Sequence, residues 1–176
     1  YGNALSGVVN IITKRGSDKP SGVLRVEKDN WIGSSTNTQH NKSTEAELTL
    51  SGPIVREKLH YFTATTLQLN DTRWWQDFDD FFSSPVSRDI SGIGKIDYVL
   101  NPKMRLTMSE VYSLKSFHDY EFSWRFNLDG LPKRSKSSFR TTGLFSHTIS
   151  DVIHYTFNIS HYFLESKIGE NKEDIS

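Results

Sequence analysis

The chain contains no cysteine, which excludes disulfide bonds and thiolate-bound metal sites. It has no apolar run approaching the about 20 residues that a membrane-spanning helix needs. Lysine plus arginine and aspartate plus glutamate both number 21, so the formal net charge is zero. A neutral chain lacks the basic field that attracts nucleic acid, and we therefore expect no nucleic-acid partner.

Targeting signals are also missing. The first residues do not combine a basic segment with an apolar stretch, as a signal peptide would, and they include no initiator methionine. The chain stops on a polar stretch, ENKEDIS. We therefore expect the 176 residues to be an internal piece of a longer protein.

The residues that are abundant favour β-structure. Aromatic residues make up 12% of the chain although hydrophobic residues reach only 35%, and the mean hydropathy is −0.53. A polar chain rich in aromatic and β-branched residues is typical of sheets rather than helical bundles. Helix signals are nearly absent, so we expect an all-β fold.

Seven strand-like segments alternate with turns along the chain. Most of them are ten residues or longer. Strands in ordinary globular sheets have a mode of about 5–6 residues, whereas a tilted membrane strand needs about 9–11. Their length therefore favours the wall of a membrane barrel. The strands are predicted at 22–32, 43–52, 59–70, 88–100, 103–116, 137–149 and 152–166.

Short and long connections alternate between these segments. The short ones are at 52–58, 101–102 and 150–151, and the long ones are at 33–42, 71–87 and 117–136. In an up-and-down meander every second connection lies at the same end of the sheet. Membrane β-barrels have this asymmetry, with short periplasmic turns and long extracellular loops. The pattern predicts that the long connections face outward.

The predicted strands have one apolar face and one polar face. Segment 152–164 places Ile153, Tyr155 and Phe157 on one face and His154 and Thr156 on the other. The exception is Glu110, which falls on the apolar face near the middle of segment 103–116. Alternation alone does not separate contact with lipid from contact with a protein core.

Aromatic residues gather near the ends of the predicted strands. Tyr61, Tyr98 and Tyr155 lie near short turns, and Trp31, Trp74, Trp75 and Phe117 lie near long loops. Two aromatic girdles at the membrane interfaces would have this distribution. An alternative from another class stays open: a soluble or surface-attached β-sandwich that binds glycans or proteins, with these aromatics in its core.

The first sixteen residues, YGNALSGVVNIITKRG, resemble the motif that closes the plug domain of TonB-dependent outer-membrane receptors. The resemblance lies in a Tyr-Gly start, a run of small residues, the stretch GVVNIITK and a final glycine. A second segment, LSGPI at 50–54, resembles the first periplasmic turn of the barrel in members with a carboxypeptidase-regulatory-like amino-terminal domain. The plug-motif positions that matter structurally are Tyr1, Gly2, Gly7, Asn10 and Gly16.

The resemblance implies two parts. Residues 1–16 would end the plug domain, and residues 17–176 would form about the first seven strands of a barrel, with a polar linker at 15–22. The fold expected is an antiparallel up-and-down meander, an incomplete piece of a transmembrane β-barrel of about 22 strands. Seven strands cannot close such a barrel, so we expect no transport by this piece alone.

The resemblance also implies a function and a place. The parent protein would take up a scarce nutrient, such as a siderophore, cobalamin or a glycan, across the outer membrane of a Gram-negative bacterium. Its partners would be outer-membrane lipid, the extracellular nutrient, and the inner-membrane TonB complex, which would act through the amino-terminal region that precedes residue 1. No cofactor is expected.

Two long loops contain candidate ligand-facing residues. Aromatic rings there offer stacking surfaces, and carboxylates offer oxygen ligands. The acidic loop lacks the glycine and distal glutamate of a calcium-binding loop, so we expect no metal site. The six histidines show no metal-ligand spacing, and no Gly-x-Ser-x-Gly stretch occurs, so we expect no catalytic residue and no enzyme. The candidates are Trp74, Trp75, Asp77, Asp79 and Asp80 in the first loop and Trp124, Arg125 and Phe126 in the second.

Overall fold

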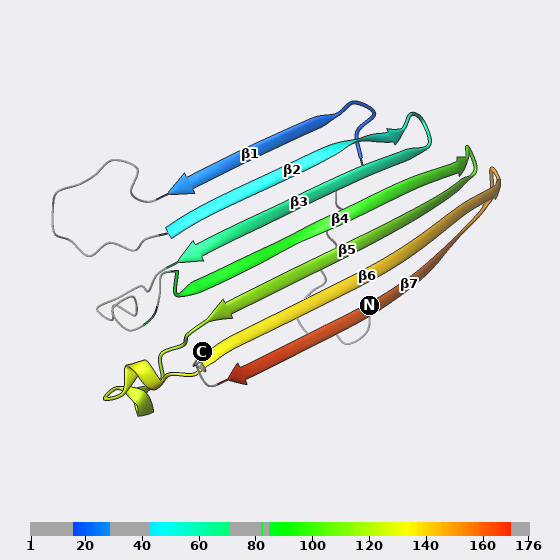
Figure 1. Cartoon of the computed structure of the whole chain (residues 1–176). Coiled ribbons are helices and arrows are strands. Elements are labelled where there is room, and N and C mark those ends of the chain that lie inside the picture. The colour runs from blue at the N-terminus through cyan, green and yellow to red at the C-terminus, as the bar shows by residue number, and fades with distance from the viewer. Residues whose placement is uncertain (1–15, 29–42, 71–81, 83–84, 170–176) are drawn as a thin grey trace, which may run out of the picture.

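The computed structural model describes residues 16–28, 43–70, 82 and 85–169. They form one antiparallel sheet of seven strands, each paired with its neighbours in the sequence (Figure 1). The expected all-β, up-and-down meander is therefore confirmed. In the described ranges no helix is long and apolar enough to cross a membrane. The strands are β1 (Ser21–Lys28), β2 (Ser43–Val55), β3 (Leu59–Asn70), β4 (Ser87–Asn101), β5 (Met104–Phe117), β6 (Lys133–Ser150) and β7 (Ile153–Gly169).

Three of the predicted strand limits are wrong by three residues or more, and one of them is the end of β7, which lies at Gly169 and not at 166. The turn predicted to begin at Gly52 begins later, because β2 continues through Pro53 to Val55 and its register shifts by a bulge between those two residues. Proline is tolerated in a sheet at such a bulge. Strand β6 begins four residues before the predicted 137, because its ladder with β5 extends to the pair Phe117–Arg134. The predicted end of the first strand, 29–32, lies outside the described residues.

Short and long connections lie at opposite ends of the sheet. The turns at 56–58, 102–103 and 151–152 lie at one end, and 118–132 lies at the other with the strand ends that flank 29–42 and 71–86 (Figure 1). We call these the short-turn end and the long-loop end. The predicted alternation of connections is confirmed.

Cross-strand register assigns each side chain to a face, because directly paired residues point to the same side of a sheet. Leu106 pairs with Tyr98 and Phe145, so these three share one face. The neighbouring Thr107 pairs with Asp97 on the opposite face. One face is mainly apolar and contains Leu24, Val26, Leu48, Leu50, Tyr61, Leu67, Ile90, Ile96, Tyr98, Leu106, Met108, Tyr112, Leu114, Phe139, Phe145, Phe157, Ile159 and Phe163.

The other face is mainly polar. Scattered apolar residues interrupt it, among them Phe62, Ile93, Val111 and Leu144. We call the two sides the apolar face and the polar face. The polar face contains Arg25, Glu45, Glu47, Thr49, Thr66, Gln68, Asp89, Ser91, Asp97, Arg105, Thr107, Ser113, Ser138, Thr142, Thr156, Asn158 and Ser160.

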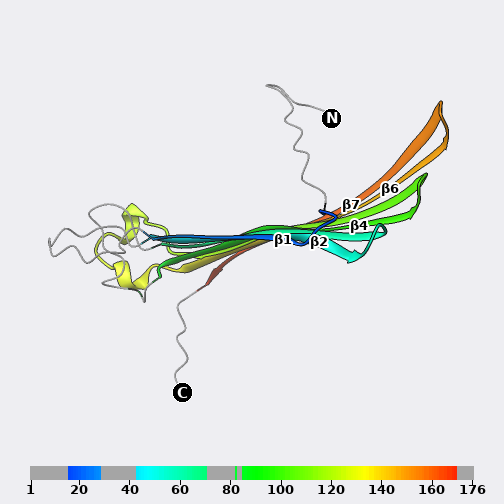
Figure 2. The ribbon, with the colours of Figure 1, turned by 90° about the horizontal axis from the view of Figure 1, so that it is seen from above.

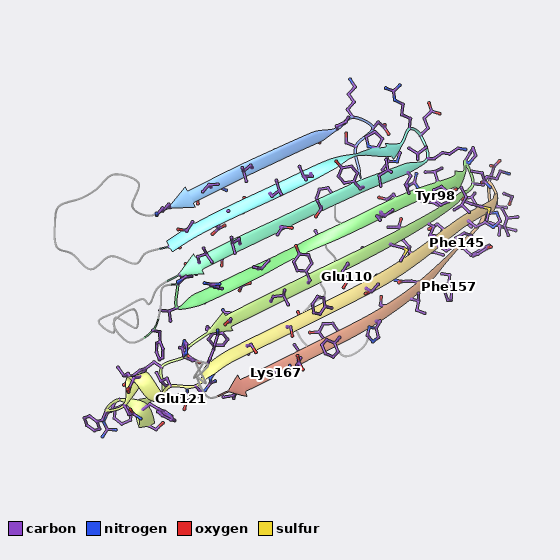
Figure 3. The ribbon with its side chains drawn as sticks, viewed as in Figure 1. Tyr98, Glu110, Glu121, Phe145, Phe157 and Lys167 are labelled. Carbon is purple, nitrogen blue, oxygen red and sulfur yellow. The ribbon has the colours of Figure 1, made fainter. Side chains whose placement is uncertain are left out.

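Aromatic rings on the apolar face gather toward the short-turn end. Tyr98 on β4, Phe145 on β6 and Phe157 on β7 lie there (Figure 3). The ring of Tyr155 lies 6.3 Å from that of Phe145, and its hydroxyl is 2.9 Å from Nδ1 of His147. Phe117 is different, because it lies on the polar face beneath the Lys115 and Lys136 ammonium groups, and its predicted place in a girdle is wrong.

The described residues form no second layer over either face of the sheet. The sheet is one twisted layer (Figure 2). Leu24, Phe157 and Ile159 are 62–69% exposed. The buried hydrophobic residues lie instead among the loops at the long-loop end, as described below. An apolar face of this extent needs lipid or protein against it, because monomeric soluble proteins rarely expose large contiguous apolar patches.

Candidate functional site

The connection 118–132 between β5 and β6 folds into a compact platform at the long-loop end (Figure 1). It contains two single turns of 3-10 helix, η2 (Phe122–Trp124) and η3 (Leu128–Gly130). The amide of Asn127 donates to the carbonyl of Trp124 at 2.8 Å, and the amide of Leu131 donates to that of Leu128 at 3.1 Å. These bonds satisfy the backbone of a segment in which the sequence predicted only a loop.

The platform has its own hydrophobic cluster. Leu131 is 1% exposed and packs with Phe82 and Val86, which precede β4. Trp124 packs against this cluster, together with Tyr120 and Leu128. The platform is therefore built from two successive long connections, and burial of these rings and aliphatic groups holds them together.

Arg134 ties the platform to the first residues of β6. Its guanidinium forms an ion pair and hydrogen bond with Glu121, which Figure 3 labels, and lies 3.8 Å from the carboxylate of Asp119. A planar guanidinium with several N–H groups can hold two carboxylates at once. Both acids precede η2, so this contact fixes where the platform leaves the sheet.

Three residues on the platform form an exposed stack of cation and rings. The guanidinium carbon of Arg125 lies 4.2 Å from the ring centroid of Phe122 and 4.4 Å from that of Phe126. Phe122 is 69% exposed and Phe126 is 89% exposed. Rings and guanidinium together offer stacking surfaces and N–H donors to a ligand, which suits sugars, aromatic groups and anions.

The structure separates the two candidates of this loop that the sequence treated alike. Arg125 is exposed in the stack, whereas Trp124 is partly buried and packs within the platform. Phe126 was predicted, but Phe122 was missed. No sequence signal points to Phe122, because its approach to Arg125 depends on the two 3-10 turns. The other candidates lie outside the described residues: Trp74, Trp75, Asp77, Asp79 and Asp80 in the preceding loop and Tyr1, Gly2, Gly7 and Asn10 in the plug-like motif.

His118 lies at the base of the platform. Its ring stacks on that of Phe82, with centroids 3.8 Å apart and planes 9° from parallel. Neither ring nitrogen has a hydrogen-bond partner among the described residues. Burial, and secondarily the charge of Lys133, lowers the pKa of His118. The folded platform therefore favours the neutral form of the His118 imidazole.

We predict that acid loosens the platform. Because the folded-state pKa of His118 is below the value of about 6.5 in an unfolded chain, the open loop takes up a proton first as the pH falls below that value. The contribution of the neutral His118 to the stability of the platform is present above this pH and decreases on acidification. Limited proteolysis across 118–132 should accelerate below that pH. The variant His118→Phe keeps a ring against Phe82, and its rate of proteolysis should not depend on pH in this range. If the variant keeps the pH dependence of the wild-type chain, a group other than His118 causes it.

The linker before β1 lies on the polar face. The amide of Ser17 donates to Oγ of Ser51 at 2.7 Å, and Asp18 Oδ1 lies 3.0 Å from Nε2 of His60, without hydrogen-bond alignment. A Cβ on Gly16 would be 2.6 Å from Cβ of His60 and 2.7 Å from the carbonyl oxygen of Tyr61. Only glycine allows so close an approach here, and the part of Gly16 in a plug motif stays a prediction.

A buried polar pair adjoins the linker on the same face. Asp97 is 5% exposed and pairs across the sheet with His60 on one side and Thr107 on the other. The hydroxyl of Thr107 donates to Asp97 Oδ1 at 2.7 Å. Asp97 Oδ2 has no hydrogen-bond partner among the described residues. Asp97 Oδ2 can therefore accept a hydrogen bond from another segment of the protein or from water.

The described residues contain no group of three or more histidines or carboxylates that could hold a metal ion. No family model, curated protein or solved structure matches the chain. The resemblance of residues 1–16 and 50–54 to TonB-dependent receptors therefore remains a prediction.

Proposed function

We propose that this chain is the part of a TonB-dependent outer-membrane receptor that joins the end of the plug domain to the first strands of the barrel. The observation that carries the proposal is the division of one long meander into an apolar face and a polar face. A barrel in a membrane has its apolar side chains outside, against lipid, and its polar side chains inside. The apolar face would contact outer-membrane lipid.

The dimensions of the sheet support this proposal. Strands β2 to β7 have 12 to 18 residues, more than enough for the about 9–11 that cross a bilayer. The short turns all lie at one end and the long connections at the other, as in such barrels. Strands β1 and β7 are the edges of the open sheet. Unpaired edges in lipid are costly, so further strands would complete the barrel.

The path of the linker gives independent support. Residues 16–18 contact the polar face through Ser51 and His60, so the chain that precedes β1 approaches from that side. In a plugged barrel the plug lies within the polar interior, which requires this approach. Force on the plug from the inner-membrane TonB complex would pass through this linker.

The platform at the long-loop end would meet the nutrient. Loops at the outer rim of a barrel are exposed and variable, and they supply binding residues. The stack of Phe122, Arg125 and Phe126 has the exposed rings and N–H donors that this role needs. The uptake function belongs to the whole receptor, since seven strands do not close a barrel.

Single-cysteine variants of β7 in the full-length protein test the membrane assignment. In outer-membrane vesicles, Thr156→Cys and Asn158→Cys on the polar face should react with a water-soluble maleimide. A fluorophore attached at Phe157→Cys or Ile159→Cys, on the apolar face, should be quenched by nitroxide-labelled lipid. A soluble sandwich would instead leave the protein in the soluble fraction, with no quenching at any of the four positions, and that result would refute the proposal.

A further inference from the structure

Four polar side chains of the described strands are buried, and they adjoin one another on the polar face. Ser51, His60, Asp97 and Thr107 are 5–9% exposed. His60, Asp97 and Thr107 are direct cross-strand partners on β3, β4 and β5, and Ser51 lies on the neighbouring β2. We call these four residues the polar cluster. Burial of polar groups is unfavourable unless each finds a hydrogen-bond partner.

The polar cluster is only partly satisfied. Ser51 Oγ accepts a hydrogen bond from the amide of Ser17, and the hydroxyl of Thr107 donates to Asp97 Oδ1, both at 2.7 Å. Asp97 Oδ2 is buried and has no hydrogen-bond partner among the described residues. None of the ion pairs in the described ranges includes Asp97. A carboxylate shielded from water needs donors from the protein, and a cationic donor gives the strongest hydrogen bond.

Residues 16–20 of the linker cross the strands on their way to β1. Pro20 lies beside β2 and in line with β1. Ser17 lies over β2, to which its amide donates a hydrogen bond. Gly16 lies over β3, where its Cβ position is 2.6 Å from Cβ of His60. Traced backward from β1, the chain therefore passes over β2 and β3 and heads for β4, the next strand of the sheet and the strand of the unpaired carboxylate oxygen.

Alternation selects the preceding residue that points to the sheet. In an extended chain every second side chain points the same way. The Cβ position of Gly16 faces His60, and the carboxylate of Asp18, two residues on, lies 3.0 Å from the same imidazole. Two residues before Gly16 the sequence has Lys14, whereas Arg15 would point away from the sheet. The segment before these two cations contains no acid, so neither has a counter-charge there.

We propose that the segment before Gly16 docks on the polar face over β4, with the ammonium group of Lys14 on Asp97 Oδ2. The spacing suits this contact, because one further strand distance, about 4.8 Å, separates β3 from β4. The ammonium group is then the second donor to this carboxylate, beside the hydroxyl of Thr107. The pair fixes the end of the plug to the wall of the barrel, a role that rests on the proposed function.

Paired cysteines test the position of Lys14 in the full-length protein in native membranes. A short bifunctional thiosulfonate should join Lys14→Cys to Asp97→Cys, and mass spectrometry of the digest identifies the joined peptides. Arg15→Cys with Asp97→Cys is the matched control and should join far less, because the adjacent side chain points away. Lys14→Cys should not join Asp89→Cys, which lies farther along the same face of β4. Equal joining in the three pairs, or none in the first, would overturn the proposal.

Hydrogen exchange at the amide of Ser17 tests the ion pair itself, because this amide is bonded to Ser51 only while the linker lies on the sheet. Lys14→Ala or Asp97→Asn should raise its exchange rate roughly tenfold, within the range for residues in contact. Both changes together should add little to either alone. Lys14→Arg, which keeps a cation, should keep the protection, and Arg15→Ala should leave it unchanged.

Two results of the exchange experiment would refute the pairing. One is an effect of Arg15→Ala equal to that of Lys14→Ala, and the other is full additivity in the double variant. Lys14 precedes the strands, so its replacement alters no residue of the sheet, and a faster exchange in Lys14→Ala reports release of the linker.

Failure of this inference is distinguishable from failure of the proposed function. If β7 labels as a membrane barrel should and the cysteines at 14 and 97 do not join, the docking over β4 is refuted and the receptor assignment stands. If the cysteines join in a full-length protein that is soluble, the docking is supported and the receptor assignment fails.

Discussion

If the chain is part of an outer-membrane barrel, as proposed, replacing Leu48 with arginine is expected to destabilise the membrane-inserted protein by about 2–4 kcal/mol, the cost of an arginine on the lipid side at mid-depth. Leu48 lies on the apolar face of β2, paired with Leu24 and Thr65. None of these neighbours is acidic, so an arginine there would have no counter-charge. The adjacent Thr49 lies on the polar face, where Thr49→Arg should change stability by less than about 0.5 kcal/mol, as surface changes usually do.

The two variants differ by one position in the same strand. Any difference between their free energies of unfolding therefore reports which face of the sheet carries the arginine. Urea unfolding of the full-length protein from lipid vesicles, followed by tryptophan fluorescence, gives both free energies of unfolding. Equal losses in Leu48→Arg and Thr49→Arg would remove the distinction between the faces on which the receptor proposal depends. A larger loss in Thr49→Arg would place the polar side against lipid.

The sequence predicts the sheet well where side chains alternate and turns are marked. Strand β3 matches its predicted range, 59–70, because polar residues adjoin both of its ends in the sequence. Strand β6 is predicted too short because its first residues, KRSKSS, are polar on both faces and show no alternation. Those residues become strand through pairing with β5, which single-sequence patterns do not contain.

The candidate site is less predictable because it depends on contacts between distant residues. Trp124 looks like a ligand-facing aromatic in the sequence, yet Leu131 and Phe82 supply a cluster that it packs against. Phe122 and Arg125 approach each other only once η2 forms. Alternation in the sequence already places Glu110 on the apolar face, whereas the hollow lined by Gly94, Met108 and Glu110 forms only through the pairing of β4 with β5.

Gly92 and Gly94 show how far pairing decides the role of a residue. Both lie on the apolar face of β4. The ring of Tyr112 reaches across Gly92, and its hydroxyl lies 2.8 Å from Oγ1 of Thr65 on β3. A Cβ at position 92 would be 2.6 Å from the carbonyl oxygen of Ala64 and 2.8 Å from the Tyr112 hydroxyl, whereas nothing lies within 4 Å of a Cβ at 94.

Gly92→Ala is therefore expected to cost about 1–3 kcal/mol, as overpacking does, because the β3 backbone and the Tyr112 ring must both move. Gly94→Ala should stabilise the chain by up to about 1 kcal/mol, since its backbone is not left-handed and the unfolded state loses freedom. Urea unfolding of both variants checks the difference.

Tyr112→Phe should cost about 0.5–1.5 kcal/mol for the lost hydrogen bond. Adding it to Gly92→Ala should relieve only the contact with the hydroxyl, because the carbonyl of Ala64 and the ring carbon Cζ, 2.9 Å from the Cβ position, still oppose the methyl group. Equal effects at 92 and 94 would mean that Tyr112 does not cross β4 as described.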